Sequence, residues 1–406
     1  MRRDTNFPID SELCSYLKKA WDKGLFDEYS DEHFLIKAIE NRLNHFVAID
    51  QLINNNFNIT GIIDENGNID FDIFNLNFCI NFSNKLNYLC ETFGESSIER
   101  FITNQLSAGK KNYSEDTFFQ ALSEVSILSF FAAQRRWDNV SYEPRLLNTS
   151  SKKNPEASFC GLFTCDNNMN PDPKEEKKVK INVEVKSARF MHDSHQKERI
   201  AIPTVLLTPE GQNLVKKYCN TNDIKYLDPR ILTLRDFINS AASKFNLPGE
   251  NEYNLLYINW SFRDFASNSF LEPWSLLTNE INGVLTHSEA AKSIDIDSDA
   301  LEKISAIIVY TESLEGLMFG DFRYVWQNNG AGNRFRMWII DNELRQLEEK
   351  GLSNILFYIT GMRPCKCLNQ HVMIDYKSKN YTEAAEGAYH SLQLSNLIKT
   401  HIKKSF

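Results

Sequence analysis

The sequence predicts an α/β protein, in which a mixed β-sheet is flanked by helices and preceded by a mainly helical region. Three observations lead to this fold class. Residues 114–137 form one long apolar helical pattern, and the runs 157–165 and 180–186 follow it as the two strands of a hairpin. The later runs 254–262 and 305–311 have the length and the apolar, β-branched and aromatic content of further buried strands.

The composition is that of an ordinary soluble globular protein, with 42% hydrophobic and 24% charged residues in a chain of 406. No run reaches the roughly 18 apolar residues that a transmembrane helix needs. The arginines near the N-terminus precede no apolar stretch, so we expect no signal peptide. The eight cysteines are scattered, which favours reduced thiols and a cytoplasmic location. The net charge of −9 argues against a generally basic surface but is compatible with a local basic groove.

The first part of the chain is predicted to be mainly helical. Apolar residues recur three and four positions apart over 11–26 and 31–53, which is the spacing of amphipathic helices. Residues 56–75 contain two alternating runs around Asn66-Gly67, which predicts a β-hairpin. A polar stretch near residue 110 is the best candidate for a domain boundary. The predicted domains are 1–110, 111–330 and a mixed C-terminal region, 331–406.

The helix expected over 114–137 is apolar nearly all round, as in a helix that is buried on every side. Ser114 is placed to cap its N-terminus, and the acidic residues that follow suit the positive end of the helix dipole. Glu124 is the exception in this pattern, because it lies between Leu122 and Val125. It is therefore a candidate for a buried carboxyl group.

The second strand of the expected hairpin carries charge on one of its faces. Ile181, Val183 and Val185 share one face, whereas Glu184 and Lys186 lie on the other. An isolated buried charge is costly, so this pair indicates a shared chemical task. A carboxylate is a hard oxygen ligand for Mg²⁺, and an ammonium group can orient a water molecule or stabilise the charge of a reacting phosphate. One carboxylate rarely suffices, so a second is expected from the neighbouring strand.

These residues, in this order, resemble the PD-(D/E)XK nuclease superfamily, which has the restriction-endonuclease-like fold. Glu184-Val185-Lys186 match the (D/E)XK part of its motif. Pro155-Glu156, directly before the first strand of the hairpin, match the Pro-Asp part, with Glu in place of the more usual Asp. This departure lengthens the first acid by one methylene group.

The resemblance spans about residues 114–265, with 255–260 as the fourth core strand. Glu124 matches the acid that many members carry on the first core helix. The resemblance implies that a restriction-endonuclease-like core follows the helical N-terminal domain. It also implies that the reaction is in-line hydrolysis of a phosphodiester bond.

The resemblance also implies a role for each matched residue. Glu156 and Glu184 would bind Mg²⁺, for which Mn²⁺ can substitute, together with the backbone carbonyl of Val185. Lys186 would position the attacking water molecule. Glu124 would assist through a water molecule or a second metal ion.

Two aspartates compete with Glu156 for the role of first metal carboxylate. Asp172 stands in a literal Pro-Asp-Pro sequence, but this sequence lies in the polar loop beyond the hairpin turn. Asp166, at the end of the first hairpin strand, has the same disadvantage. Glu156 is therefore preferred.

Structural explanations also exist for the charged residues. Glu184 and Lys186 would then be a solvated pair on an exposed strand, and Glu124 would lie near the surface and pair with Arg135 or Arg136.

The predicted function is Mg²⁺-dependent cleavage of DNA, as an endonuclease of restriction or anti-phage defence, a role that resembling proteins often have. Cutting both strands would require two active sites, so we expect a homodimer or a larger complex with a partner protein, and no membrane association. One alternative is a non-catalytic subunit with a degenerate nuclease fold that binds nucleic acid or recruits a partner. Another is an RNase.

Overall fold

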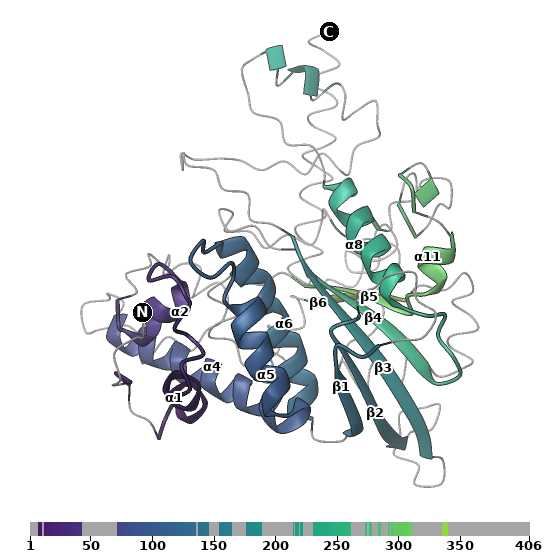
Figure 1. The fold of residues 1–406 in the computed structure, drawn as a ribbon. Helices are drawn as coiled ribbons and strands as arrows, with labels where there is room; N and C mark the ends of the chain where they lie inside the picture. Colours follow the sequence, from purple (N-terminus) through teal and green to yellow (C-terminus); the bar gives the residue numbers. More distant parts are fainter. Residues whose placement is uncertain are drawn as a thin grey trace, which may run out of the picture.

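The computed structural model shows a six-stranded mixed sheet with helices on both faces (Figure 1). In sheet order, the strands are β1 (Trp137–Tyr142), β2 (Ala157–Thr164), β3 (Glu176–Ser187), β4 (Glu252–Asn259), β5 (Ala306–Tyr310) and β6 (Phe335–Ile339). β1, β2 and β3 form an antiparallel meander, β3, β4 and β5 run parallel, and β6 is antiparallel to β5. The sheet therefore changes from antiparallel to parallel pairing at β3.

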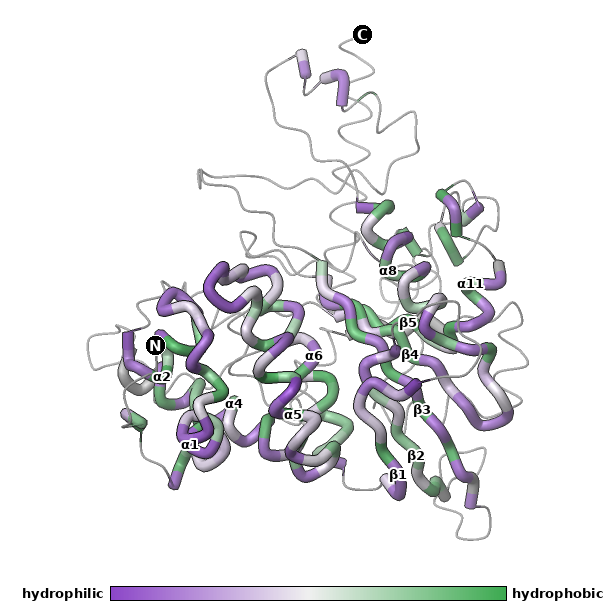
Figure 2. The backbone as a smooth tube through the Cα atoms, viewed as in Figure 1, coloured by the Kyte–Doolittle hydropathy of each residue, from purple (hydrophilic) through white to green (hydrophobic). Residues whose placement is uncertain are grey.

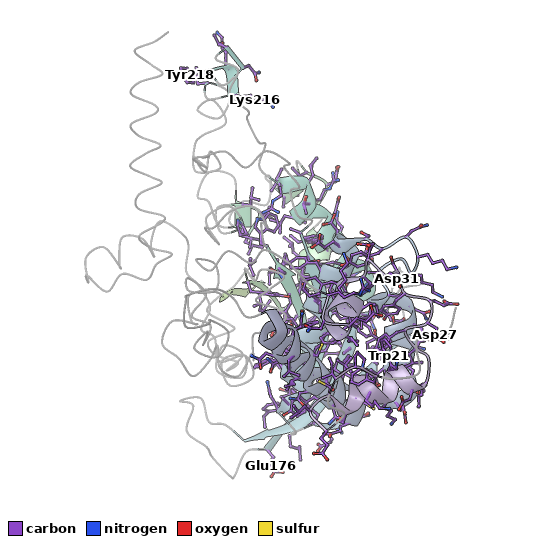
Figure 3. All side chains as sticks on the ribbon, turned by 90° about the vertical axis from the view of Figure 1, so that its left-hand side faces the viewer. Trp21, Asp27, Asp31, Glu176, Lys216 and Tyr218 are labelled. Carbon is purple, nitrogen blue, oxygen red and sulfur yellow. The ribbon has the colours of Figure 1, made fainter. Side chains whose placement is uncertain are left out.

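The described residues are those of the sheet, of its flanking helices and of the adjoining turns. They are 7–9, 12–42, 71–134, 137–145, 154–164, 176–188, 230–260, 298–310 and 335–339, with scattered positions within 214–221 and 273–296. Figure 3 shows Glu176, the first residue of β3, at the lower tip of the molecule, whereas Glu184 further along the same strand is fully buried.

The helices before the sheet are α1 (Ser15–Asp22), α2 (Phe34–Ile39), α4 (Phe71–Phe93), α5 (Glu95–Phe101), the π-helix η1 (Ile102–Leu106) and α6 (Glu115–Ala133). Figure 1 shows α4, α5 and α6 beside one face of the sheet, with α1 and α2 further out. Two buried side chains from the segment between α1 and α2 contact η1. The hydroxyl of Tyr29 donates to the carbonyl of Ile102 at 2.5 Å, and the ring of His33 contacts the carbonyl of Leu106 at 2.9 Å.

Helix α6 begins where the sequence predicts, because Ser114 caps it. The hydroxyl of Ser114 accepts the N–H of Thr117 at 3.4 Å, and two acidic residues occupy the first turn. The helix is buried along most of its length between α4 and the sheet, which explains its apolar pattern. Phe131 near its end stacks on Phe159 of β2, with 5.0 Å between the ring centroids.

One hydrophobic cluster joins the N-terminal helices, α6 and this face of the sheet. It contains, for example, Leu17 of α1, Phe82 of α4, Phe131 of α6 and Val183 of β3. The packing is therefore continuous across residue 110. The division of the chain into three domains stays a prediction.

A second cluster covers the opposite face of the sheet under α8 (Ile231–Lys244) and α11 (Ser298–Glu302). Leu234, Ile238 and Ala241 of α8 pack with Leu256 and Ile258 of β4 in this cluster. Figure 2 shows hydrophobic stretches of α6, β4 and β5 in green. The central strands are therefore covered on both faces, as parallel strands usually are.

The hairpin predicted over residues 56–75 is wrong in its second half, because α4 begins at Phe71. Residues 56–70 lie outside the described ranges. The buried residues Phe78, Phe82, Leu86 and Leu89 of α4 recur three and four positions apart, which is helical spacing. Apolar alternation over a few residues fits both a strand and a helix, and here the longer pattern determines the structure.

The strands predicted at 157–165, 180–186, 254–262 and 305–311 are confirmed as β2, β3, β4 and β5. The fold is α/β with a mixed sheet and flanking helices, as the sequence predicts. Among the described residues, no helix is both long and apolar enough to cross a membrane.

Phe131→Ala is expected to lower the free energy of unfolding by about 3–5 kcal/mol, because the stack on Phe159 is replaced by a cavity. Urea denaturation followed by circular dichroism measures this loss. Leu162→Ala is the control. Leu162 lies on β2, as Phe159 does, but it is 49% exposed, so this substitution should lower the free energy of unfolding by less than about 1 kcal/mol. Equal losses in both variants would contradict the packing of α6 on the sheet through Phe131.

Candidate active site

The hairpin of β2 and β3 places two carboxylates side by side. β2 begins at Ala157, which pairs with Val183, so Glu156 stands directly before the ladder and next to Glu184 on the neighbouring strand. The N–H of Glu156 donates to the carbonyl of Val183 at 3.0 Å, and its carbonyl accepts the N–H of Glu143 at 2.8 Å. The backbone of Glu156 is therefore held from both sides.

Glu184 and Lys186 lie on the face of the sheet that α8 covers. In the register of β3 and β4, Glu184 is opposite Leu256 and Lys186 is opposite Ile258, and both partners belong to the cluster under α8. Val185, between them, belongs to the cluster on the other face. The alternation in the sequence thus corresponds to the two faces of β3.

Two ammonium groups meet on one oxygen atom of Glu184. The Nζ atoms of Lys186 and Lys244 lie 2.6 Å and 2.5 Å from Oε1. The Nζ of Lys244 also lies 3.4 Å from Oε1 of Glu156. The other oxygen of Glu184, Oε2, is buried and has no hydrogen-bond partner among the described residues. Glu184 has no exposed surface, so these lysines offset much of the cost of burying its charge.

Lys244 was not predicted from the sequence. Leu234, Ile238 and Ala241 form the buried stripe of α8, and Lys244 extends this stripe into the last turn with only 6% of its surface exposed. A lysine on an amphipathic helix normally keeps its ammonium group in water, so the pattern alone predicts an exposed side chain. Its position three residues after Ala241 was the available signal.

Glu124 is buried on α6, as the sequence predicts, with 6% of its surface exposed. Its Oε1 accepts the hydroxyl of Tyr142 at 2.9 Å. Burial and then the carboxylates of Glu156 and Glu184 raise the pKa of Glu124 well above its ordinary value, and the hydroxyl of Tyr142 opposes this shift. Glu124 is therefore close enough to sense both charges, and its environment favours the protonated form more than water does.

The N-terminal helices contact the residues beside the site. Arg100 of α5 forms an ion pair with Glu143 at 2.9 Å and lies over the ring of Tyr142, 5.9 Å from its centroid. Gln105 of η1 donates to the other carboxylate oxygen of Glu143 at 3.1 Å. Glu143 has a positive φ of 46°, a conformation that these contacts help to stabilise.

The carbonyl of Val185 points towards the edge of β3 that β2 leaves open. Carbonyl groups two residues apart on a strand point the same way, and the carbonyl of Val183 accepts the N–H of Glu156. The ladder with β2 ends at Val183, so the carbonyl of Val185 lies past the start of β2, on the edge where Glu156 stands.

The structure thus gathers the four residues predicted to be catalytic, Glu124, Glu156, Glu184 and Lys186, around the end of the hairpin. It adds Lys244 and Tyr142, which the sequence did not indicate. These side chains come from α6, β1, β3 and α8 and from the residue directly before β2. Asp166 and Asp172, the rival carboxylates, lie outside the described residues, as do Arg135 and Arg136.

Lys244 and Glu156 have opposite charges, and the pKa of each is raised above its ordinary value. Burial, and then Glu184, raise the pKa of Glu156 from 4.5 to about 7, although Lys244 and Lys186 oppose the shift. Burial lowers the pKa of Lys244, but Glu156 and Glu184 raise it by more. The ammonium group of Lys244 therefore stays charged in the buried site.

The raised pKa of Glu156 predicts how stability depends on pH. Between pH 4.5 and about 7 the folded protein binds more protons at Glu156 than the unfolded chain, so this group's contribution to stability is lost as the pH rises through that window. Glu156→Gln should remove a decrease of about 3 kcal/mol across the window. Urea denaturation in EDTA at a series of pH values, with wild type compared with the variant, measures it. A difference between the two proteins that does not change with pH would contradict the prediction.

The chain was compared with protein families, with curated proteins and with solved structures. No protein family, curated protein or solved structure matches it.

Proposed function

We propose that this chain is a metal-dependent phosphodiester hydrolase that cleaves DNA, with Glu156, Glu184 and Lys186 at its centre. The observation that carries the proposal is the burial of Glu156 and Glu184, with Glu124 and Lys244, beside the half-buried Lys186 at the end of one hairpin. Buried ionisable groups are costly and cluster where chemistry is done. The resemblance to PD-(D/E)XK nucleases supplies the reaction class.

The residues present fit a magnesium ion. Within the described ranges, no group of three or more His, Cys, Asp or Glu side chains is arranged as a metal site. Magnesium, however, is commonly bound by one or two carboxylates and several water molecules. Glu156 and Glu184 would hold it with the carbonyl of Val185, and the unpartnered Oε2 of Glu184 is a buried oxygen still available as a ligand. When bound, such an ion activates a water molecule and neutralises charge on the phosphate.

The protein side chains would perform the remaining tasks. Lys186, 12% exposed at its side chain, is the most accessible charged group on this part of β3, so its ammonium group can face the attacking water and the phosphate. Glu124 can take up or release a proton near the carboxylates, since its pKa is raised by burial and by Glu156. Tyr142 fixes the orientation of Glu124 through its hydroxyl.

The proposed oligomeric assembly and biological role of this chain rest on the resemblance alone. Cleavage of both DNA strands requires two such sites, so the active form is a homodimer or a larger complex with a partner protein. The proposed role is restriction or anti-phage defence in the cytoplasm.

A second candidate function is a non-catalytic subunit that binds nucleic acid or a partner. Lys244 favours it, because an ammonium group within 3.4 Å of both Glu156 and Glu184 balances their charge without any metal ion. An RNase remains a variant of the first proposal, since the same groups can hydrolyse either backbone. The assay below separates these functions.

Lys186→Ala is expected to reduce cleavage of supercoiled plasmid by a factor on the order of 10²–10³, because the group that faces the reacting phosphate is lost. Nicked and linear products are measured on gels with Mg²⁺, with Mn²⁺ and with EDTA, and a single-stranded and a duplex RNA are tested in parallel. Cleavage of RNA alone would identify an RNase.

Lys180→Ala is the matched control for this assay. Lys180 lies on the same strand and is paired with Glu252 at 2.7 Å, but its side chain is 38% exposed and remote from the hairpin end. Its variant should cleave as the wild type does. A wild type that is inert on every substrate would favour the non-catalytic subunit, and a Lys186→Ala variant as active as wild type would show that the site is assigned wrongly.

A further inference from the structure

Lys244 occupies the space between the two carboxylates that the proposed function assigns to a metal ion. Its Nζ lies 2.5 Å from Oε1 of Glu184 and 3.4 Å from Oε1 of Glu156. A metal ion bound by both carboxylates would have to lie in the same space. An ammonium group and a divalent cation repel each other strongly at such distances in a buried site.

The second lysine, Lys186, makes it easier for Lys244 to leave the two carboxylates. Lys186 approaches the same Oε1 of Glu184 at 2.6 Å, so two positive groups share one oxygen atom. Their mutual repulsion lowers the cost of releasing one of them. Lys244 contacts both carboxylates, whereas Lys186 contacts Glu184 only, so the release of Lys244 is the step that frees both ligands.

Glu184 also has an oxygen atom that a cation could use as a ligand. Its Oε2 is buried and has no partner among the described residues, although the carboxylate is fully enclosed. A lysine has a flexible four-carbon stem and can withdraw its ammonium group without movement of α8. The exchange of Lys244 for a cation therefore requires a change of side-chain conformation alone.

We propose that Lys244 is an internal counter-cation, which holds Glu156 and Glu184 together before metal binds and must leave them for metal to bind. The inference rests on the proposed function, because it concerns the same two carboxylates. It assigns to α8 the control of metal loading. The site is then kept in an ordered, charge-balanced state until a divalent ion displaces Lys244.

Mn²⁺ binding to the full chain, measured by calorimetry without nucleic acid, tests the proposal. Lys244→Met removes the ammonium group and retains an unbranched apolar stem. This variant should bind Mn²⁺ at least about tenfold more tightly than wild type, because no cation has to be displaced. Lys180→Met is the matched control, since Lys180 pairs with Glu252 elsewhere on β3, and it should bind Mn²⁺ as wild type does.

Thermal unfolding gives a readout that does not depend on activity. In EDTA, Lys244→Met should unfold at a lower temperature than wild type, because Glu156 and Glu184 lose a counter-cation. Added Mn²⁺ should raise the unfolding temperature of the variant more than that of wild type. Lys244→Gln serves the same purpose if the methionine variant does not fold, and Lys244→Arg, which keeps the charge, should bind Mn²⁺ no more tightly than wild type.

The outcomes separate this inference from the proposed function. If wild type binds Mn²⁺ and the neutral variants bind it equally or more weakly, Lys244 does not compete with metal, and only the inference is overturned. Tighter binding by Lys244→Arg, equal to that of the neutral variants, also overturns it. If neither wild type nor any variant binds Mn²⁺, both the inference and the metal-dependent function are overturned.

Discussion

The burial of the Glu184 carboxylate is the constraint on which the rest of this site depends. A carboxylate without exposed surface is stable only if positive groups are placed close to it, and here two lysines share one of its oxygens. One lysine comes from the same strand and the other from α8, so the strand and the helix must be positioned together. The packing of α8 on β4, through Leu256 and its neighbours, therefore supports the electrostatic arrangement as well as the hydrophobic core.

The two faces of the sheet contribute different parts of the site. The face under α8 holds Glu184 with its lysines, whereas Glu124 belongs to α6, which packs on the other face. The N-terminal helices reach the site through Arg100, which contacts Glu143 and Tyr142, and these residues in turn bond to Glu156 and Glu124. A shift of α5 would consequently be transmitted to both acids through a short chain of contacts. The N-terminal part of the chain is thus connected to the site by direct contacts.

The sequence predicted those features that local patterns determine. Alternation and short apolar runs identified the strands, and the capping serine located the start of α6. The one acid beyond the first turn of this apolar helix indicated that Glu124 is buried. It failed where contacts between distant segments decide the outcome. The start of α4 at Phe71 follows from packing over the whole helix, and Lys244 contacts Glu184 across 60 residues of sequence. A single helix cannot reveal that its last lysine faces a carboxylate on a strand that lies so far away in the chain.

The change from antiparallel to parallel pairing at β3 has a consequence for the order of folding. β2 and β3 are neighbours in an antiparallel hairpin, and such contacts form early because little chain has to be closed. The parallel pairing of β3 with β4 joins residues about 72 positions apart, so α8 and β4 are expected to dock late. Glu156 and Glu184 then meet before Lys244 arrives, while water can still solvate both carboxylates. The docking of α8 therefore buries the two carboxylates and at the same time brings in the ammonium group that offsets the cost of burying them.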